Sequence, residues 1–487
     1  MCGVLMLRRK AYDRLVEWKG RQDHKSLLIR GQRQVGKTFI IREFSKTYEN
    51  STYVDLSSNA RMRRAFRDSI EVEDVLEALM LQDRTFDPYS GRCLIILDEI
   101  QSSPWARQAL KSFTEDGRFD VIASGSLPDV PLRARAYDES DERDERGRDD
   151  AVPLIPVGYE EHMRMYSLDF EEFLWAKGYG DATIAKVRES IRQRVPLSGV
   201  LLDAMNDEFR EYTMFGGMPE PVSKLVTGEG LRSVIKAMDD VVASNYNDIS
   251  KYAEEGEVLK IRKTLESIPM QLSQSNKKFM YSRIEGNRKS REGARKYQES
   301  LLWIEGSGIG NMCHQLRDIT VPVSMSSNPD QFKVYISDTG MLVRMMDGDG
   351  VRAMDAIRTG DIGFNQGSLT ENVVAECLMK SGIDRNYYIH RKEPGRMELD
   401  FVIDLGSETA AIEVKSGRDR EAPSLSKTIG DGRFQRRLMF ERSNISVDEN
   451  GVEHYPLFAA AFVRDMGRSD DWVEDYSCRR AEPGRGL

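Results

Sequence analysis

The stretch Gly31-Gln-Arg-Gln-Val-Gly36-Lys37-Thr38 matches the phosphate-binding loop pattern G-x-x-x-x-G-K-[ST] at every fixed position. The apolar segment 26–30 before it predicts a short buried strand, and the segment 39–44 after it predicts a helix. Bound phosphates would then lie at a helix N-terminus, where backbone N–H groups and the helix dipole favour anions. The stretch therefore predicts a P-loop nucleotide fold rather than a chance glycine-rich turn.

The residue types of this loop also assign its roles in binding ATP and Mg²⁺. The glycines let backbone N–H groups wrap an anion, Lys37 reaches the β- and γ-phosphates, and the Thr38 hydroxyl contacts Mg²⁺. We expect the whole loop to contact the nucleotide, through Gly31, Gln32, Arg33, Gln34, Val35, Gly36, Lys37 and Thr38.

A second nucleotide motif follows further along the chain. The apolar run 93–97 is typical of a strand buried on both faces of a parallel sheet, and it ends in Asp98 and Glu99. An acid at this strand end holds the Mg²⁺ shell, and the adjacent glutamate polarises the attacking water. We therefore predict Asp98 as a metal ligand and Glu99 as the general base.

Strands and helices are predicted to alternate around these motifs, which favours a parallel α/β sheet. The predicted strands cover 52–56 and 120–123, and the predicted helices cover 72–81 and 105–114. Ser124 and Ser126 follow the last strand. Either hydroxyl could sense the γ-phosphate or cap a turn, and we take Ser126 as the candidate nucleotide contact.

Composition limits the remaining possibilities. A chain of 487 residues exceeds one core, and roughly three domains are expected. Its net charge of −9 argues against a generic nucleic-acid binder, so a local patch must provide any such contact. The five cysteines and five histidines lack zinc, redox or triad spacing, which favours a reducing cytoplasm and argues against serine or cysteine hydrolase chemistry. No apolar run approaches the ~20 residues of a membrane span.

The middle of the chain predicts helices over 179–255 and, over 256–345, the helices and strand pair that make up a winged helix. A basic patch, 277–296, lies within the second segment and predicts salt-dependent contact with DNA phosphates. A solvated helix face or a contact with an acidic segment are the alternatives. The patch holds eight basic residues against Glu285 and Glu292: Lys277, Lys278, Arg283, Arg288, Lys289, Arg291, Arg295 and Lys296.

A second group of chemically important residues lies near the C-terminus. A two-residue turn at Gly406-Ser407 would pair Asp400 with Glu413, and Glu398 with Lys415. Like charges directly opposite are destabilising, and a bridging Mg²⁺ or Mn²⁺ would reverse that penalty. This is the D…E-x-K layout of metal-dependent nucleases, in which the lysine orients or activates water.

The helix predicted over 370–378 adds a third candidate metal ligand, Glu371. Together with the hairpin it predicts a restriction-endonuclease-like fold, whereas ordinary surface ion pairs are the alternative. Active cleavage is a separate hypothesis, because a fold does not carry its chemistry automatically.

Several segments resemble the AAA-type P-loop ATPases of bacteria and archaea that carry a C-terminal domain of unknown function. The similarity runs over most of residues 6–465, and it implies an ATPase core, a helical lid, a winged helix and a nuclease-like C-terminal domain. The segments that carry it, besides the loop, are 97–105, 124–127, 156–159, 165–175 and 215–219.

One segment departs from that family. An insertion at 133–152 contains the acidic run 138–150, which predicts a solvated, disordered arm. It falls where many relatives place an arginine finger, and Arg133, Arg135 and Arg164 are the candidates. A finger acting in trans, and hence a homo-oligomer, is implied by the resemblance alone.

The sequence thus predicts an ATPase core at 1–178, a lid at 179–255, a winged-helix-like domain at 256–345, a nuclease-like domain at 360–465 and a flexible tail at 466–487. The predicted function is an ATP-hydrolysing molecular switch coupled to a nucleic-acid-binding, nuclease-like module. One alternative is a nucleotide-gated binding or signalling protein that does not cleave. Another is a metal-dependent nuclease whose ATPase is regulatory.

Overall fold

The computed structural model describes residues 6–126, 158–252, 255–285, 293–390, 397–417 and 423–467. The acidic run and Arg133, Arg135, Arg288, Lys289 and Arg291 lie outside these ranges. The chain divides into two compact units. Unit 1 comprises Met1–Leu168, Met218–Leu265 and Asn287–Gly310, and unit 2 comprises Asp169–Gly217, Glu266–Gly286 and Asn311–Leu487.

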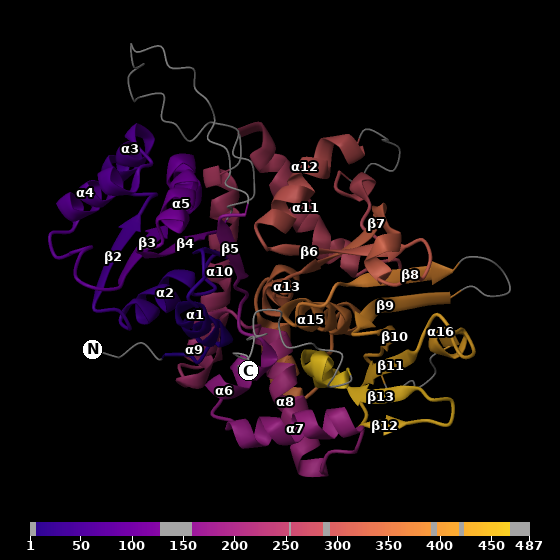
Figure 1. The fold of residues 1–487 in the computed structure, drawn as a ribbon. Coiled ribbons are helices and arrows are strands. Elements are labelled where there is room, and N and C mark those ends of the chain that lie inside the picture. The colour runs from indigo at the N-terminus through magenta and orange to yellow at the C-terminus, as the bar shows by residue number, and fades with distance from the viewer. Residues whose placement is uncertain are drawn as a thin grey trace, which may run out of the picture. The chain divides into compact units, whose positions relative to one another are not determined.

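Unit 1 is built on a five-stranded sheet whose strands are all parallel, in the order β2-β3-β4-β1-β5 (Figure 1). This confirms the predicted parallel α/β sheet. The edge strand β5 was not predicted, because its sequence Glu-Glu-His-Met-Arg lacks an apolar run. The strands are β1 (Ser26–Arg30), β2 (Asn50–Asp55), β3 (Cys93–Asp98), β4 (Asp120–Gly125) and β5 (Glu160–Arg164).

Helices cover this sheet because their apolar stripes are buried against it. Leu76 of α4 and Leu110 of α5 belong to one fully buried cluster with Ile95 of β3. The helices of unit 1 are α1 (Lys10–Gly20), α2 (Lys37–Ser45), α3 (Ala60–Asp68), α4 (Val72–Gln82), α5 (Pro104–Asp116), α9 (Pro219–Val226), α10 (Leu231–Tyr252) and α12 (Gly293–Gly306), with a 3₁₀ turn, η1, at Ile100–Ser102. Helix α11 (Glu255–Leu272) crosses from unit 1 into unit 2.

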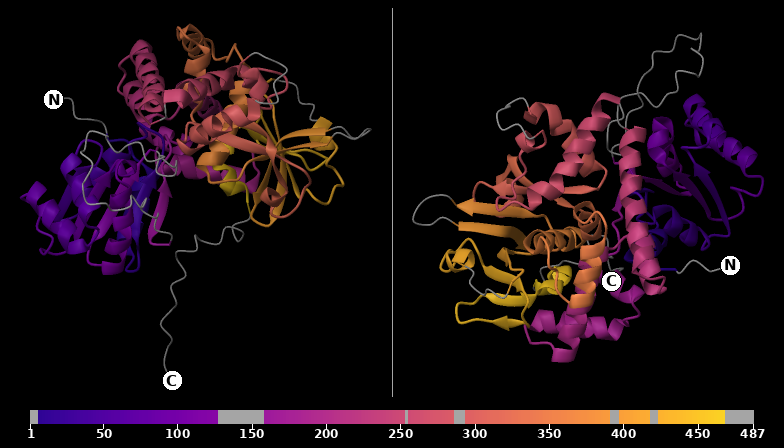
Figure 2. Two further views of the ribbon diagram at one scale, coloured as in Figure 1. Left: turned by 90° about the horizontal axis from the view of Figure 1, so that it is seen from above. Right: turned by 180° about the vertical axis from the view of Figure 1, so that it is seen from behind.

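Unit 2 is built on a mixed eight-stranded sheet in the order β12-β13-β11-β10-β9-β8-β6-β7, traced in orange and yellow in Figure 2. Strands β9 and β10 form an antiparallel hairpin, whereas β10–β11, β11–β13 and β6–β8 pair in parallel. The strands are β6 (Gly310–Leu316), β7 (Ser327–Ile336), β8 (Asn386–His390), β9 (Met397–Leu405), β10 (Glu408–Val414), β11 (Arg436–Glu441), β12 (Ser446–Val447) and β13 (Glu453–Pro456).

The most deeply buried helix of unit 2 is α15, whose residues from Ser368 to Met379 are all buried. Burial on every side explains why this helix has no polar face. The helices of this unit are α6 (Phe170–Ala176), α7 (Asp181–Gln193), α8 (Gly199–Phe215), α13 (Thr339–Met346), α14 (Val351–Thr359), α15 (Gln366–Lys380) and α16 (Pro423–Ser426), with 3₁₀ segments η2 (Tyr281–Arg283), η3 (Val323–Ser326) and η4 (Leu457–Met466).

The two units do not follow the domain boundaries expected from the sequence. The segment 179–255, predicted as one helical lid, contributes α7 and α8 to unit 2 and α9 and α10 to unit 1. The predicted strand pair of 256–345 is present as β6 and β7, which lie in the same sheet as β8 to β13. Among the described residues, no helix is long and apolar enough to cross a membrane.

Candidate functional site

The phosphate-binding loop joins β1 to α2, as its sequence predicts. Gly36 turns the chain into the helix with φ +94°, a left-handed conformation that glycine adopts without strain. The Lys37 ammonium folds back over the loop and donates hydrogen bonds to the carbonyl oxygens of Gly31 at 2.7 Å and Gln32 at 2.8 Å. The loop therefore holds a cation directly above its own backbone.

This cation is not neutralised by a bonded carboxylate. The side chain is buried, and its bonds within the described residues go to carbonyl groups. Burial lowers the pKa of Lys37 to about 8, because removing the ammonium from water disfavours its charged form. A buried lysine bonded to neutral acceptors fits an anionic ligand such as the phosphates of ATP, which would restore the missing charge.

Asp98, at the end of β3, accepts hydrogen bonds from three hydroxyl groups. Its Oδ2 accepts hydrogen bonds from the Thr38 hydroxyl at 2.7 Å and the Tyr53 hydroxyl at 2.8 Å. Its Oδ1 accepts one from the Ser124 hydroxyl. A hydroxyl and a carboxylate side by side at the loop are the oxygen donors that Mg²⁺ takes in P-loop proteins, so this pair fits the ion.

Glu99, the predicted general base, adopts a left-handed conformation with φ +55°. Its Oε2 accepts a hydrogen bond from the Gln101 amide. Its Oε1 lies 4.0 Å from Nη2 of Arg33, whose Nε forms an ion pair with Asp248 of α10. The loop arginine thus contacts both the candidate base and a helix distant in the sequence.

Two side chains that contact the loop, Asn245 and Arg9, were not predicted. Asn245 of α10 accepts a hydrogen bond from Gln32 at 3.1 Å, and Arg9 donates to the carbonyls of Val35 at 2.9 Å and Tyr166 at 2.7 Å. Their partners lie far away in the chain, so no local motif announces them. The predicted contact Ser126 is buried, and its hydroxyl has no hydrogen-bond partner in the described part of the chain.

The C-terminal hairpin has the register that its turn predicts. Glu408 pairs with Leu405 and Ile412 with Phe401, so the next step of the ladder brings Glu413 opposite Asp400. Asp400 Oδ2 accepts a hydrogen bond from the Val414 N–H at 2.9 Å. The hairpin therefore brings the two predicted acids together.

The lysine of this motif directly follows the end of β10 and pairs with Glu413 of that strand. Lys415 forms an ion pair with Glu413 at 2.9 Å. Glu398, expected opposite Lys415, has a half-exposed side chain that lies 3.9 Å from Nζ of Lys333. The ion pair that the sequence offered as an alternative to catalytic chemistry is thus present.

Glu371 of α15 is deeply buried and is bound by two lysines. Its Oε1 accepts from Lys333 of β7 at 2.9 Å and from the Tyr335 hydroxyl. Its Oε2 forms an ion pair with Lys277, whose Nζ also donates to the Gly367 carbonyl at 3.2 Å. Neither lysine was predicted as part of this cluster, because their partners lie 38 and 94 residues away.

The charges of this cluster shift its pKa values in opposite directions. Burial and the neighbouring Glu371 and Glu413 raise the pKa of Asp400 to about 7. Burial also disfavours ionised Glu371, but the two lysines overcome it and lower the pKa of Glu371 to about 2. Burial lowers the pKa of Lys333, and the Glu371 and Asp400 carboxylates outweigh it, so the net shift is upward. An ionised Lys333–Glu371 pair follows.

These residues, as they are arranged, do not fit a divalent cation. Among the described residues, no group of three or more His, Cys, Asp or Glu side chains is arranged to hold a metal ion. Lysines take up both oxygens of Glu371, although Oε2 of Glu413 is buried without a hydrogen-bond partner.

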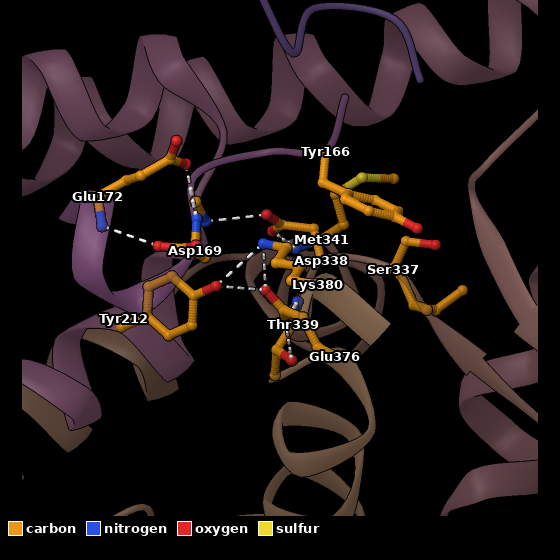
Figure 3. Close-up of polar contacts among 12 residues, drawn as sticks. Tyr166, Asp169, Glu172, Tyr212, Ser337, Asp338, Thr339, Met341, Glu376 and Lys380 are labelled. Carbon is orange, nitrogen blue, oxygen red and sulfur yellow. Dashed lines mark hydrogen bonds and ion pairs between the residues drawn. The ribbon is translucent and has the colours of Figure 1, made fainter. Parts of the chain in front are cut away.

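A second glutamate of α15, Glu376, is buried in a different network of unit 2 (Figure 3). Its Oε1 accepts from Tyr212 at 2.8 Å and Lys380 at 2.7 Å, and its Oε2 accepts from the Thr339 N–H at 2.7 Å. All of these groups are buried and hydrogen-bonded together, so this network stabilises the unit rather than offering a binding site.

The neighbouring Asp338 explains the glycine at 216. Its Oδ2 accepts a hydrogen bond from the Gly217 N–H at 2.9 Å. A Cβ atom at Gly216, which has φ +73°, would lie 2.0 Å from Oδ1 of Asp338. The predicted lid turn therefore needs glycine so that this buried carboxylate can approach the backbone.

Three described members of the predicted basic patch make contacts inside unit 2. Lys277 binds Glu371, Lys278 donates to Gln315 at 2.7 Å and Gln331 at 3.0 Å, and Arg283 donates to the Asn276 carbonyl at 3.4 Å. Arg164, the one described candidate for an arginine finger, stacks over Tyr166 with 5.4 Å between the guanidinium carbon and the ring centre.

Comparison with known proteins adds to this picture. Residues 23–174 match a family described as an AAA domain, and residues 206–352 and 366–453 match two domains of unknown function, DUF8612 and DUF4143. None of the curated proteins matches the chain.

Among solved structures, the Walker-type ATPase PABY2304 of Pyrococcus abyssi is 11% identical, with 70% of this chain and 96% of that chain covered and a TM-score of 0.42. The Aeropyrum pernix ORC1 protein in complex with DNA is 14% identical, with coverage of 72% and 95% and a TM-score of 0.29. The family match and the parallel sheet together identify residues 23–174 as an AAA-type P-loop domain.

Proposed function

We propose that the chain binds ATP and Mg²⁺ at the Gly31–Thr38 loop, hydrolyses the nucleotide, and uses the nucleotide state to switch unit 2. The observation that carries this proposal is the buried Lys37 ammonium, bonded to loop carbonyls and lacking a bonded carboxylate. ATP phosphates would supply the negative charge that this cation lacks.

The residues around the loop would divide the work of hydrolysis. Thr38 and Asp98 would hold Mg²⁺, which would supply positive charge to stabilise the phosphates when bound. Lys37 binds the phosphates, and Glu99 accepts a proton from the attacking water. Glu99 must leave its present contact with Gln101 to reach that water.

The test is ATP turnover by the full chain with Mg²⁺, compared with the Lys37→Ala variant. Removing the ammonium that folds back over the loop should lower turnover by about 10²-fold or more. Equal turnover in the two proteins would refute the proposal. Lys46→Ala is a matched control, because Lys46 is an exposed lysine beyond the end of α2 that pairs with Glu43.

The second candidate function is metal-dependent cleavage of nucleic acid by unit 2. It is favoured by the hairpin register that pairs Asp400 with Glu413, with Lys415 beside them. The lysines on Glu371 oppose it, so no step through a metal ion is derived. A module that binds nucleic acid or a partner without cleaving it is the alternative.

Plasmid cleavage in Mn²⁺ distinguishes the two functions of unit 2. Cleavage by the wild type that is lost in the Asp400→Ala, Glu413→Ala double variant, with ATP turnover retained, would support the nuclease. Wild-type protein that cuts no nucleic acid with Mg²⁺ or Mn²⁺ would favour the binding module. Neither result bears on the ATPase proposal, which the turnover of the Lys37→Ala variant tests separately.

A further inference from the structure

Arg9, the residue immediately before α1, is a buried arginine that connects two distant segments of unit 1. Its Nη1 donates a hydrogen bond to the Val35 carbonyl of the phosphate-binding loop at 2.9 Å, and its Nη2 donates to the Tyr166 carbonyl at 2.7 Å. The residue is only 8% exposed. Because the guanidinium group is planar and rigid, the two bonds fix the positions of both carbonyl groups relative to each other.

The Tyr166 carbonyl is itself anchored to the parallel sheet. Tyr166 lies two residues beyond the end of β5, and the preceding Met165 donates its N–H to the Arg30 carbonyl at 2.7 Å. Arg30 is the last residue of β1, directly before the phosphate-binding loop. Arg9 therefore braces the loop against the sheet.

The bond to Val35 also determines the direction of the next N–H group. The Val35 carbonyl and the Gly36 N–H belong to one peptide group, which is planar and trans, so they point in opposite directions. Gly36 has φ +94°, and a glycine has little intrinsic preference that would fix this peptide group by itself. Holding the Val35 carbonyl toward Arg9 therefore holds the Gly36 N–H toward the opposite side.

We propose that Arg9 is a positioning residue of the nucleotide site, which holds the Val35–Gly36 peptide group so that the Gly36 N–H can bind the β-phosphate. Backbone N–H groups of loops with this pattern cradle the α- and β-phosphates. Arg9 acts through the loop backbone and not by touching the phosphates. This inference rests on the proposed binding of ATP at Gly31–Thr38, and it adds a residue outside the motif that prepares the loop.

The experiment measures binding of ATP and of ADP, each with Mg²⁺, to the full chain by calorimetry. Arg9→Ala should weaken both nucleotides by about tenfold, because both carry the β-phosphate that loses an oriented N–H group. Lys37→Ala should instead weaken ATP more than ADP, because Lys37 reaches the γ-phosphate as well. Arg14→Ala removes an exposed arginine of α1 and is the matched control, with the affinities of the wild type.

Turnover separates positioning from a general loss of structure. Arg9→Ala should raise KM for ATP by about tenfold and leave kcat within about twofold, because the bond to the β-phosphate is present in both the ground state and the transition state. Partial unfolding would lower kcat and leave KM unchanged. Arg9→Lys keeps the charge without the planar fork, so it should recover only part of the lost affinity.

Four results would overturn the inference, and three of them leave the proposed function in place. These three are equal ATP and ADP affinities of wild type and Arg9→Ala, a lower kcat at unchanged KM, and full recovery by Arg9→Lys, which would assign the effect to charge alone. The fourth is a wild-type protein that binds neither nucleotide, which would overturn the proposed function as well.

Discussion

Two buried lysines, one in each unit, have opposite partners. Lys37 of the phosphate-binding loop bonds carbonyl oxygens, and burial lowers its pKa to about 8. Lys333 of β7 bonds a carboxylate, and its pKa lies above its ordinary value although burial alone would lower it. A buried cation on neutral acceptors can gain an anionic ligand, whereas a buried cation on a carboxylate is already neutralised. The first arrangement suits binding and the second suits stability.

Replacing each lysine by methionine should separate these roles, with the largest effect in unit 2. Lys333→Met leaves Glu371 with one fewer cation in a buried position, and we expect a loss of about 3 kcal/mol in the free energy of unfolding. Lys37→Met removes a desolvated cation that has no bonded carboxylate, so its loss should be smaller. Urea unfolding of both variants measures the difference.

A second substitution checks the cause of this loss. Glu371→Gln in the Lys333→Met background removes a buried charge that has lost one of its two lysines, and it should recover part of the stability. A double variant no more stable than Lys333→Met would indicate that packing of the lysine stem, and not its charge, stabilises β7.

The pH dependence of ATP affinity should be the next largest effect, and it belongs to Lys37. The pKa of Lys37 is about 8 in the free protein. Bound phosphates must raise this pKa, because a nearby negative charge favours the ammonium. Affinity should therefore stay level from pH 7 to about 7.5, then fall above pH 8 by up to about tenfold per pH unit. Calorimetry at pH 9 in buffers of different ionisation enthalpy should detect proton uptake on binding. An ATP affinity that stays constant up to pH 9.5 would contradict the view that the buried Lys37 gains its negative partner from the nucleotide.

The sequence predicts the unit 1 site more completely than the unit 2 cluster, for a physical reason. The loop residues, Thr38 and Asp98 lie on elements that one parallel sheet must bring together at its edge. The Asp400–Glu413 pairing also follows from sequence, because a two-residue turn fixes the hairpin register. Lys333 and Lys277 are different, because their contacts with Glu371 depend on how α15 packs. No local pattern sets that packing.

The edge strand β5 and the pairing of β6 with β8 were not predicted from the sequence, for similar reasons. β5 has a polar sequence and pairs with β1 alone, so neither an apolar run nor alternation indicates a strand. Strands β6 and β7 look like a separate hairpin in the sequence. Their place in the eight-stranded sheet comes from the parallel pairing of β6 with β8, about 70 residues further along the chain.

The smallest expected effect concerns the arginine that lies between two acids in unit 1. Arg33 forms an ion pair with Asp248 and lies 4.0 Å from Glu99. In the Asp248→Ala variant, Glu99 becomes the nearest acid for this guanidinium, and a base held by arginine is less free to accept a proton. We expect kcat for ATP to fall about three- to tenfold, with a smaller change in KM.

If Arg33 causes this loss, Asp248→Ala should have little effect in an Arg33→Ala background. Asn245 lies on the same helix but is bonded to Gln32. Any change in kcat that Asn245→Ala causes should therefore be the same with and without Arg33. An Asp248→Ala loss that is the same with and without Arg33 would mean that α10 acts on the site by packing alone.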